Sequence, residues 1–127
     1  MLTGTWSGSS SGSIVSDATK KNHIEGIDER YDNLFDYLIP KRFQYNDGTS
    51  NRYHTGFIAQ DVQKAIEESG LTEKDFAALC TFSSGENESF MGLRYEEFIA
   101  INTRQIQLLK SRIAELERLL SATQIVE

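Results

Sequence analysis

The longest uninterrupted helical pattern in the sequence lies near its C-terminal end, from Tyr95 to about Thr123. Neither glycine nor proline interrupts this stretch, which is rich in residues of high helix propensity. Apolar residues recur in it with the seven-residue period of a coiled coil, at heptad positions a and d. The predicted seam, in which asparagine is the polar exception, consists of Ile99, Asn102, Ile106, Leu109, Ile113, Leu116 and Leu120. The pattern therefore predicts a long helix that associates with other copies of itself.

The positions beside this seam agree with a parallel association. Arg112 at position g and Glu117 at the following position e would attract each other across two chains. The alternative is a long helix buried against its own domain. We favour association because so short a body cannot cover both apolar faces of the helix, and we expect Ile101 and Leu108 to pack onto that body. Taken alone, isoleucine at a with leucine at d favours two strands.

The region before the long helix has the patterns of a small α+β body. Its turn signals are Asn46-Asp47-Gly48 and Ser84-Gly85-Glu86-Asn87. The predicted elements are a helix over 24–38 that stops before Pro40, a β-hairpin over 43–59, a helix from about 61 to 70, and two strands over 79–82 and 89–93. The predicted fold class is thus α+β, with a mixed body of helices and hairpins and a long C-terminal helix.

Charge and composition exclude several classes of function. The formal net charge of −6 argues against a nucleic-acid partner, which normally requires clustered Lys and Arg. No apolar run approaches the roughly 18–20 residues needed to cross a bilayer, so we predict no membrane partner. No glycine motif for phosphate is present, and neither His23 nor His54 has a second ligand at metal spacing, so we predict no cofactor and no metal. Cys80 is predicted to be a buried, inert thiol.

The first fifteen residues differ in composition from the rest of the chain. They carry no charged side chain and are dominated by serine, glycine and threonine. Such a segment is either a flexible linker or the end of a repetitive β-structured shaft, and its apolar and branched residues leave both interpretations open. We therefore place a boundary between an upstream segment, 1–15, and a domain formed by 16–127.

The residue types for covalent chemistry occur at this boundary, beginning with Ser16. A serine hydroxyl becomes nucleophilic when a base removes its proton, and a lysine amine is such a base when desolvation keeps it neutral. On a regular helix, residues four apart share a face better than residues five apart, which favours Lys20 over Lys21. The alternative without chemistry is that Ser16 or Asp17 caps a helix and both lysines are solvated.

Three ordered stretches of the sequence resemble one known family. The first begins at Ser16 with Ser-Asp, has a lysine five residues after the serine, and continues through Asn22 to the aliphatic Ile24. The second is Gly56-Phe57-Ile58-Ala59-Gln60-Asp61-Val62, and the third is the helix from Tyr95 onward. Over residues 16 to about 120, the chain is similar to the self-cleaving C-terminal intramolecular chaperone domain of phage tail spikes, tail fibres and neck appendages.

The resemblance implies a module that brings three chains into register, helps an upstream triple-β-helical shaft to fold, and then releases itself. Carried onto this chain, it makes Ser16 the nucleophile and Lys21 the general base of a Ser/Lys dyad that cuts between Val15 and Ser16. Ile24 sets the register that selects Lys21, although Lys20 stands where family members commonly have an apolar residue. The long helix then forms a parallel trimeric coiled coil.

The resulting hypothesis is a homotrimer that works in the host cytoplasm during virion assembly and afterwards leaves the particle. One alternative is a trimerisation module that does not cut, which a chain shortened before Ser16 would exclude. The other is a receptor-binding tip with exposed aromatic residues on the loops 46–53 and 83–90. Loss of the domain from the mature particle would exclude that alternative.

Overall fold

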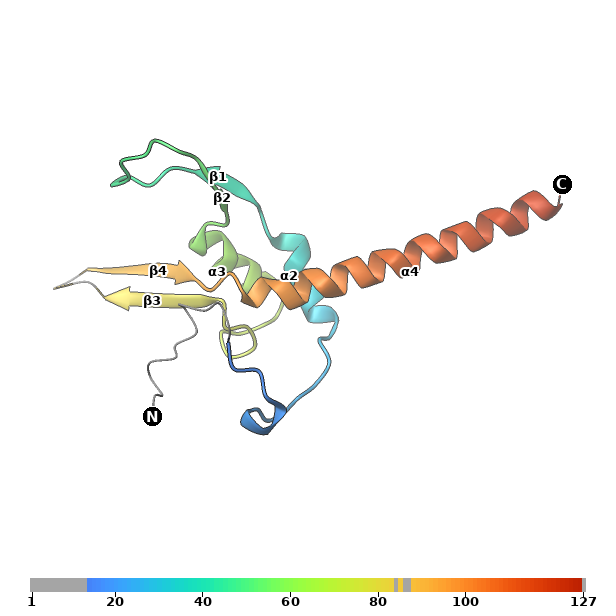
Figure 1. Ribbon diagram of the computed structural model, residues 1–127, viewed down its shortest axis with the longest axis horizontal. Helices are drawn as coiled ribbons and strands as arrows, with labels where there is room; N and C mark the ends of the chain where they lie inside the picture. The colour runs from blue at the N-terminus through green and yellow to red at the C-terminus, as the bar shows by residue number, and fades with distance from the viewer. Residues whose placement is uncertain (1–13, 84, 86–87, 127) are drawn as a thin grey trace.

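A single long helix extends from a body of short elements (Figure 1). The structure is a computed structural model that describes residues 14–83, 85 and 88–126. Its elements are the 3₁₀ helix η1 (Ala18–Lys20), α2 (Glu29–Tyr37), β1 (Lys41–Phe43), β2 (His54–Gly56), α3 (Ala59–Glu68), β3 (Leu79–Ser83), β4 (Ser89–Leu93) and α4 (Glu97–Val126). The predicted α+β class with a long C-terminal helix is confirmed.

Helix α2 begins later than its apolar spacing indicates. The prediction placed its start at Ile24, which is wrong because Asp28 is the N-cap and its carboxylate accepts a hydrogen bond from Arg30 N at 2.9 Å. Gly26 lies just before this cap and disfavours a helical start further upstream. Ile24 is therefore outside the helix and 69% exposed, whereas Leu34 on its inner face is fully buried.

Two separate antiparallel hairpins form the β-structure. In the first, β1 pairs with β2 so that Phe43 lies opposite His54. In the second, β3 pairs with β4 so that Leu79 lies opposite Leu93, and Figure 1 shows this hairpin pointing away from the free end of α4. Both hairpins were predicted, but the first ends at Gly56 instead of continuing to 59. Of the predicted turn over 84–87, only Gly85 lies within the described residues.

Helix α3 supplies the centre of the core. Val62, Ala65 and Ile66 are buried on its inner face, as the sequence predicted. The helix ends in a Schellman motif in which Leu71 N donates to Ile66 O at 3.2 Å, and Gly70 supplies the required left-handed backbone with φ of +83°. The core as a whole consists of Leu34, Val62, Ala65, Ile66, Leu71, Phe76, Ala78, Phe98 and Ile101.

The first turns of α4 attach it to the body. Phe98 and Ile101 are buried in the core. Arg104 donates to both carboxylate oxygens of Asp32 on α2, at 2.7 and 2.8 Å, and Gln105 Nε2 donates to the same carboxylate at 2.6 Å. Every residue from 106 to 123 is exposed. Leu108, at 41% exposure, therefore does not pack onto the body as predicted, because the body ends one turn before it.

The Asp32 contacts lead to a pH-dependent prediction. Replacing Asp32 by asparagine should lower the free energy of unfolding by about 1 kcal/mol at neutral pH, because Arg104 loses its carboxylate partner. The hydrogen bonds from Arg104 hold the pKa of Asp32 below its ordinary value of 3.8. A carboxyl group with a lowered folded-state pKa stabilises the fold above its unfolded-state pKa, and this contribution disappears as the pH falls through the folded-state value.

The difference between wild type and Asp32→Asn should therefore be complete near neutral pH and shrink below about pH 3.8. Urea unfolding at a series of pH values measures it, at one protein concentration because association shifts apparent stability. The matched control is Glu115→Gln, which removes the exposed pair between Glu115 and Arg118 and should leave unfolding unchanged. Equal effects of the two substitutions at neutral pH would contradict the prediction.

The structure bears on three topics from the sequence: membrane spans, metal sites and the thiol of Cys80. Within the described residues, no helix combines the length and the apolarity that a bilayer crossing requires. In the same part of the chain, no group of three or more His, Cys, Asp or Glu side chains is arranged to hold a metal ion. Cys80 on β3 is half-buried, and so more accessible than predicted.

Candidate functional site

The structure brings Ser16 and Lys21 into direct contact. Lys21 Nζ donates a hydrogen bond to Ser16 Oγ, and the two atoms are 2.8 Å apart. Both residues are exposed in the single chain. The residue pair that the resemblance selected is thus the pair that meets in space, and the hydrogen bond to Ser16 comes from Lys21 although Lys20 has the spacing of a regular helix.

The local backbone explains why the contact spans five residues. Between the two side chains the chain forms η1, a single 3₁₀ turn, and not an α-helix. Lys21 follows this turn with an extended backbone, φ of −125° and ψ of 160°. The rule that residues four apart share a face holds for a continuous α-helix. It does not apply to a chain that turns once and then becomes extended, so helical spacing does not describe which lysine contacts Ser16 here.

Asp17 caps this turn. Its Oδ1 accepts hydrogen bonds from Thr19 N and from Thr19 Oγ1, each at 2.9 Å. These bonds, first that of the backbone N–H and then that of the hydroxyl, lower the pKa of the Asp17 carboxyl. The sequence offered helix capping by Ser16 or Asp17 as an alternative to chemistry, and the structure shows that Asp17 does act as a cap while Ser16 contacts Lys21.

Ser16 and Lys21 line an open groove against the N-terminal half of α4. Ile14 and Val15 lie in the same groove, so the predicted scissile bond and the two side chains share one surface. The groove is completed by Ile27, Glu96, Glu97, Ile99, Ala100, Thr103, Arg104 and Gln107. Ile99 is the first residue of the predicted seam. The candidate site therefore lies directly beside the start of the surface that is predicted to associate.

The predicted seam has no partner within its own chain along the described part of α4. Each of its apolar residues is more than half exposed, from 55% at Ile113 to 63% at Ile99, and Asn102 is exposed as well. The body contacts Phe98 and Gln105 at heptad position g and Ile101 at position c. The groove is lined at positions b and e by Ala100, Gln107 and Thr103, and Arg104 at position f contacts both. The seam thus separates two different flanks, which the heptad pattern alone did not reveal.

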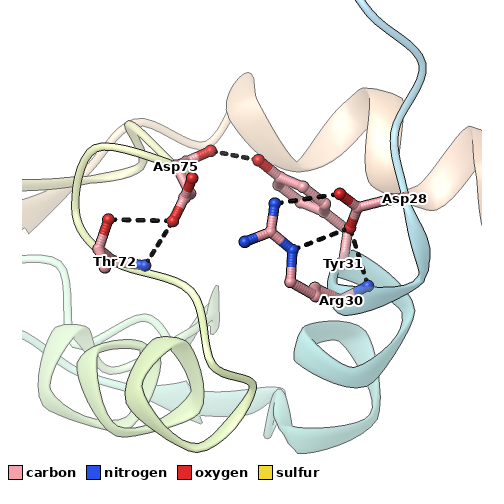
Figure 2. A network of polar contacts seen from close by, with 5 residues as sticks. All are labelled: Asp28, Arg30, Tyr31, Thr72 and Asp75. Carbon is pink, nitrogen blue, oxygen red and sulfur yellow. Dashed lines mark hydrogen bonds and ion pairs between the residues drawn. The ribbon is translucent and has the colours of Figure 1, made fainter.

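A second polar cluster joins the start of α2 to the loop before β3 (Figure 2). Asp28 pairs with Arg30, and Tyr31 OH donates to the backbone oxygen of Asp75 at 2.5 Å. The Asp75 carboxylate accepts from Thr72 N at 2.8 Å and from Thr72 Oγ1 at 3.0 Å, a capping arrangement within this loop. Every side chain in Figure 2 has a hydrogen-bond or ion-pair partner, and the bond from Tyr31 to Asp75 links α2 to the loop before β3.

The two histidines lie apart from each other. His23 lines a pocket beside the Figure 2 cluster and has a left-handed backbone with φ of 49°. His54 on β2 packs against the rings of Phe43 and Tyr45, with centroid distances of 6.1 and 5.0 Å. Among the described residues, neither histidine ring forms a hydrogen bond with Ser16 or Lys21.

The second motif of the resemblance, 56–62, forms the junction between β2 and α3. Tyr95 OH accepts a hydrogen bond from Phe57 N at 3.1 Å and donates one to Phe57 O at 3.3 Å. The Phe57 ring stacks on Phe98 with a centroid distance of 5.0 Å. Asp61 lies in the first turn of α3 and pairs with Lys41 Nζ at 2.7 Å. This motif thus connects the hairpin, α3 and the base of α4.

Gly56 leads to the next prediction, because a Cβ atom at this position would clash with Tyr95 OH. Gly56→Ala should lower the free energy of unfolding by about 2 kcal/mol, since relief of the clash requires the hydroxyl to leave both Phe57 backbone groups. Thermal unfolding measures the effect. Gly26→Ala is the control, since nothing lies within 4 Å of the added atom there. An equal loss in both variants would show that the Tyr95 contact is not the cause.

Exposed aromatic residues are found on both hairpins, as the receptor-tip alternative requires. Phe82 and Phe90 stack on each other with a centroid distance of 5.4 Å while remaining 49% and 54% exposed. On the first hairpin, Tyr53 is 56% exposed and carries the Arg42 guanidinium 3.9 Å above its ring. These side chains contact one another in pairs, Phe82 with Phe90 and Tyr53 with Arg42. They lie on elements other than the Ser16–Lys21 turn.

Comparisons with known proteins find a matching family and a related phage protein. Residues 16–71 match the Peptidase_S74 family, described as chaperone of endosialidase. Over 99 residues the chain is 29% identical to "Depolymerase 1, capsule K3-specific" of Klebsiella phage KP32, a match that covers 74% of this chain. This chain spans only 11% of the length of that relative.

Two solved structures share the fold. The first is a crystal structure described as a novel intramolecular chaperone, with a TM-score of 0.64 and 20% identity, covering 76% of this chain and 99% of that one. The second is the carboxy-terminal domain of the bacteriophage T5 L-shaped tail fibre with its intramolecular chaperone domain. It gives a TM-score of 0.53 at 17% identity and covers 85% of this chain and 32% of that one.

Proposed function

Since the chain carries an intramolecular chaperone domain of the Peptidase S74 family, the kind found in phage tail fibres and depolymerases, we propose that it assembles as a homotrimer, directs folding of an upstream shaft and then cuts itself off. Membership of this family implies self-cleavage. In our proposal the cut falls between Val15 and Ser16. The observation that carries it is the 2.8 Å hydrogen bond between Lys21 Nζ and Ser16 Oγ, next to that bond.

The proposed reaction is a single turnover within each chain. Ser16 Oγ attacks the carbonyl carbon of Val15 while Lys21 removes the hydroxyl proton. The C–N bond then breaks, the Ser16 nitrogen receives a proton and becomes a free amine, and Val15 is left as an ester on Ser16 Oγ. Water hydrolyses this ester to the Val15 carboxylate and the serine hydroxyl. A nucleophile adjacent to its target needs no substrate site, because proximity replaces binding.

Assembly supplies the condition that the base needs. An amine acts as a base only when it is neutral, and removal from water favours the neutral form of an amine. Ser16 and Lys21 are exposed in the single chain. In a parallel coiled coil, position e of one helix faces position g of the next. The groove lies on the e flank and the body lies on the g flank, so the body of a neighbouring chain would close over Lys21.

This arrangement would make the cut depend on assembly in the correct register. A chain alone leaves the groove open to water and should remain whole. A trimer with aligned seams closes each groove with the next chain and starts the reaction. Cleavage then removes the chaperone from the equilibrium, so an assembled shaft cannot return to its precursor. We place the partner count at three on the family relationship, because the seam residues alone favour two strands.

The proposed domain boundary lies immediately before Ser16. Residues 1–15 would be the end of the upstream shaft, of which 1–13 lie outside the described residues. The reaction would take place in the host cytoplasm during virion assembly, and residues 16–127 would be absent from the mature particle. The curated relative is named a capsule-specific depolymerase, and this chain corresponds to a small part of it. A depolymerase or fibre shaft upstream of this domain is the corresponding proposal here.

The intact mass of the chain, expressed behind an authentic shaft, tests the proposal. We expect two products, an upstream part that ends at Val15 and a released part that begins at Ser16. A chain that stays whole in an assembled trimer would leave a chaperone that does not cut. A domain that persists on the mature particle would instead favour the receptor-binding tip, with the exposed Phe82 and Phe90 as its contact surface.

A further inference from the structure

The turn between Ser16 and Lys21 depends on very few interactions. Two backbone hydrogen bonds close it, from Lys20 N to Asp17 O at 2.9 Å and from Lys21 N to Ala18 O at 3.2 Å. A helical turn this short has little stability of its own, because nucleation is unfavourable and no further turns follow. All residues from 16 to 21 are exposed, so core packing does not hold the turn either. Its geometry must therefore come from local contacts.

The Asp17 side chain supplies two of these contacts. Its Oδ1 receives both the backbone N–H and the hydroxyl of Thr19. The Asp17 backbone is extended, with φ of −72° and ψ of 131°, and the chain turns immediately after it. Lys21 is extended again. Ser16 and Lys21 thus lie on either side of one turn, which the Asp17 side chain caps.

We propose that Asp17 is a positioning residue for self-cleavage, whose capping of the turn holds the Lys21 amine within hydrogen-bond distance of the Ser16 hydroxyl. The inference rests on the proposed function, in which these two groups perform the cut. Asp17 acts through the backbone, since its hydrogen bonds go to Thr19 and not to the reacting side chains. In this proposal the cap and the Ser16–Lys21 pair work together, because the capped turn positions the two side chains.

The proposal distinguishes the accepting oxygen of Asp17 from its charge. Asparagine keeps an oxygen that can receive the Thr19 N–H, and it is as good an N-cap as aspartate. Alanine removes that oxygen without adding bulk. If capping is the role, Asp17→Asn should preserve the reaction and Asp17→Ala should not. If the carboxylate itself moved a proton or attracted the lysine, both substitutions would slow the cut equally.

The experiment measures the first-order rate of cleavage in the full chain with its authentic upstream segment, for wild type, Asp17→Ala, Asp17→Asn and Thr19→Val. Asp17→Ala should cut about tenfold more slowly, the rate equivalent of a typical lost cap. Asp17→Asn should stay within about threefold of wild type, and its pH–rate profile should keep the wild-type shape. Thr19→Val removes only the hydrogen bond of the hydroxyl, so its cleavage rate should lie between those of Asp17→Ala and Asp17→Asn.

Assembly and folding are monitored beside the rate, by chain mass in solution and by the melting temperature. A second readout is independent of cutting: hydrogen exchange across 17–21 in the Ser16→Ala background should be faster in Asp17→Ala and unchanged in Asp17→Asn. Normal cutting by Asp17→Ala, or equal slowing by both Asp17 variants, would overturn the inference while the dyad stands. A wild-type chain that assembles and stays whole would overturn the proposed function together with it.

Discussion

Replacing Lys21 by alanine should abolish the cut before Ser16, whereas replacing Lys20 by alanine should leave its rate within about threefold of wild type. The loss should reach about 10³-fold, within the range that a general base contributes. The physical reason is position: Lys21 Nζ lies 2.8 Å from Ser16 Oγ. The two lysines are adjacent and both exposed, so each variant is the matched control of the other for charge and for folding.

Two more substitutions separate the parts of this prediction. Ser16→Ala should leave the chain whole, because no other hydroxyl is adjacent to the Val15 carbonyl in the proposed reaction. Lys21→Arg should also fail to cut, since a guanidinium retains its proton under any condition a protein tolerates. Intact mass against time gives each rate, and the mass in solution shows whether the chain still assembles. Cutting that survives Lys21→Ala and disappears in Lys20→Ala would show that the base is misassigned.

Replacing Leu109 by aspartate should prevent assembly and, with it, self-cleavage. Leu109 occupies position d of the seam and is 61% exposed in the single chain, so association is what would remove it from water. A carboxylate from each chain would then meet at one layer of a dry interface, and the cost of burying unpaired charge exceeds what the remaining layers supply. The same chains should keep a folded body, because the substituted residue lies beyond it.

Leu108→Asp is the matched control for this experiment. Leu108 is the neighbouring residue, has the same side chain and is 41% exposed, but it lies at position c, outside the seam. This variant should assemble and cut like wild type. Sedimentation equilibrium measures the number of chains in each particle. Three chains are expected for wild type and one for Leu109→Asp, and an assembled, cutting Leu109→Asp variant would exclude the seam as the interface.

An experiment with mixed chains tests the coupling between assembly and cutting. If the neighbouring body closes the groove, mixing Ser16→Ala chains with wild-type chains should leave the wild-type chains cut, because each dyad is complete within its own turn and requires only a partner body. If cutting requires a side chain of the partner's turn instead, the mixed particles would cut less than in proportion to their wild-type content.

Much of the fold follows from short-range patterns. The long helix α4, the inner face of α3 and the presence of both hairpins were predicted correctly because periodicity and turn residues act over a few positions. The seam along α4 stays a prediction. Predictions were wrong where a local cap set the start of a helix or where the limited size of the body left a side chain exposed. With Asp28 as its N-cap, α2 begins at Glu29, five residues after the predicted start at Ile24. Leu108 stays exposed because the body ends at Arg104 and Gln105.

The candidate site divides in the same way. Residue types, their order and the family resemblance propose Ser16, Lys21 and the bond before Ser16, and these assignments stay predictions. That the amine reaches the hydroxyl across five residues depends on a capped 3₁₀ turn, which helical spacing rules do not describe. That the Ser16–Lys21 pair lies on one flank of the predicted seam and the body on the other depends on how α4 packs against Asp32, Phe57 and the core. Periodicity is a property of one segment, whereas the side of a helix that faces a neighbour is set by contacts between segments far apart in the chain.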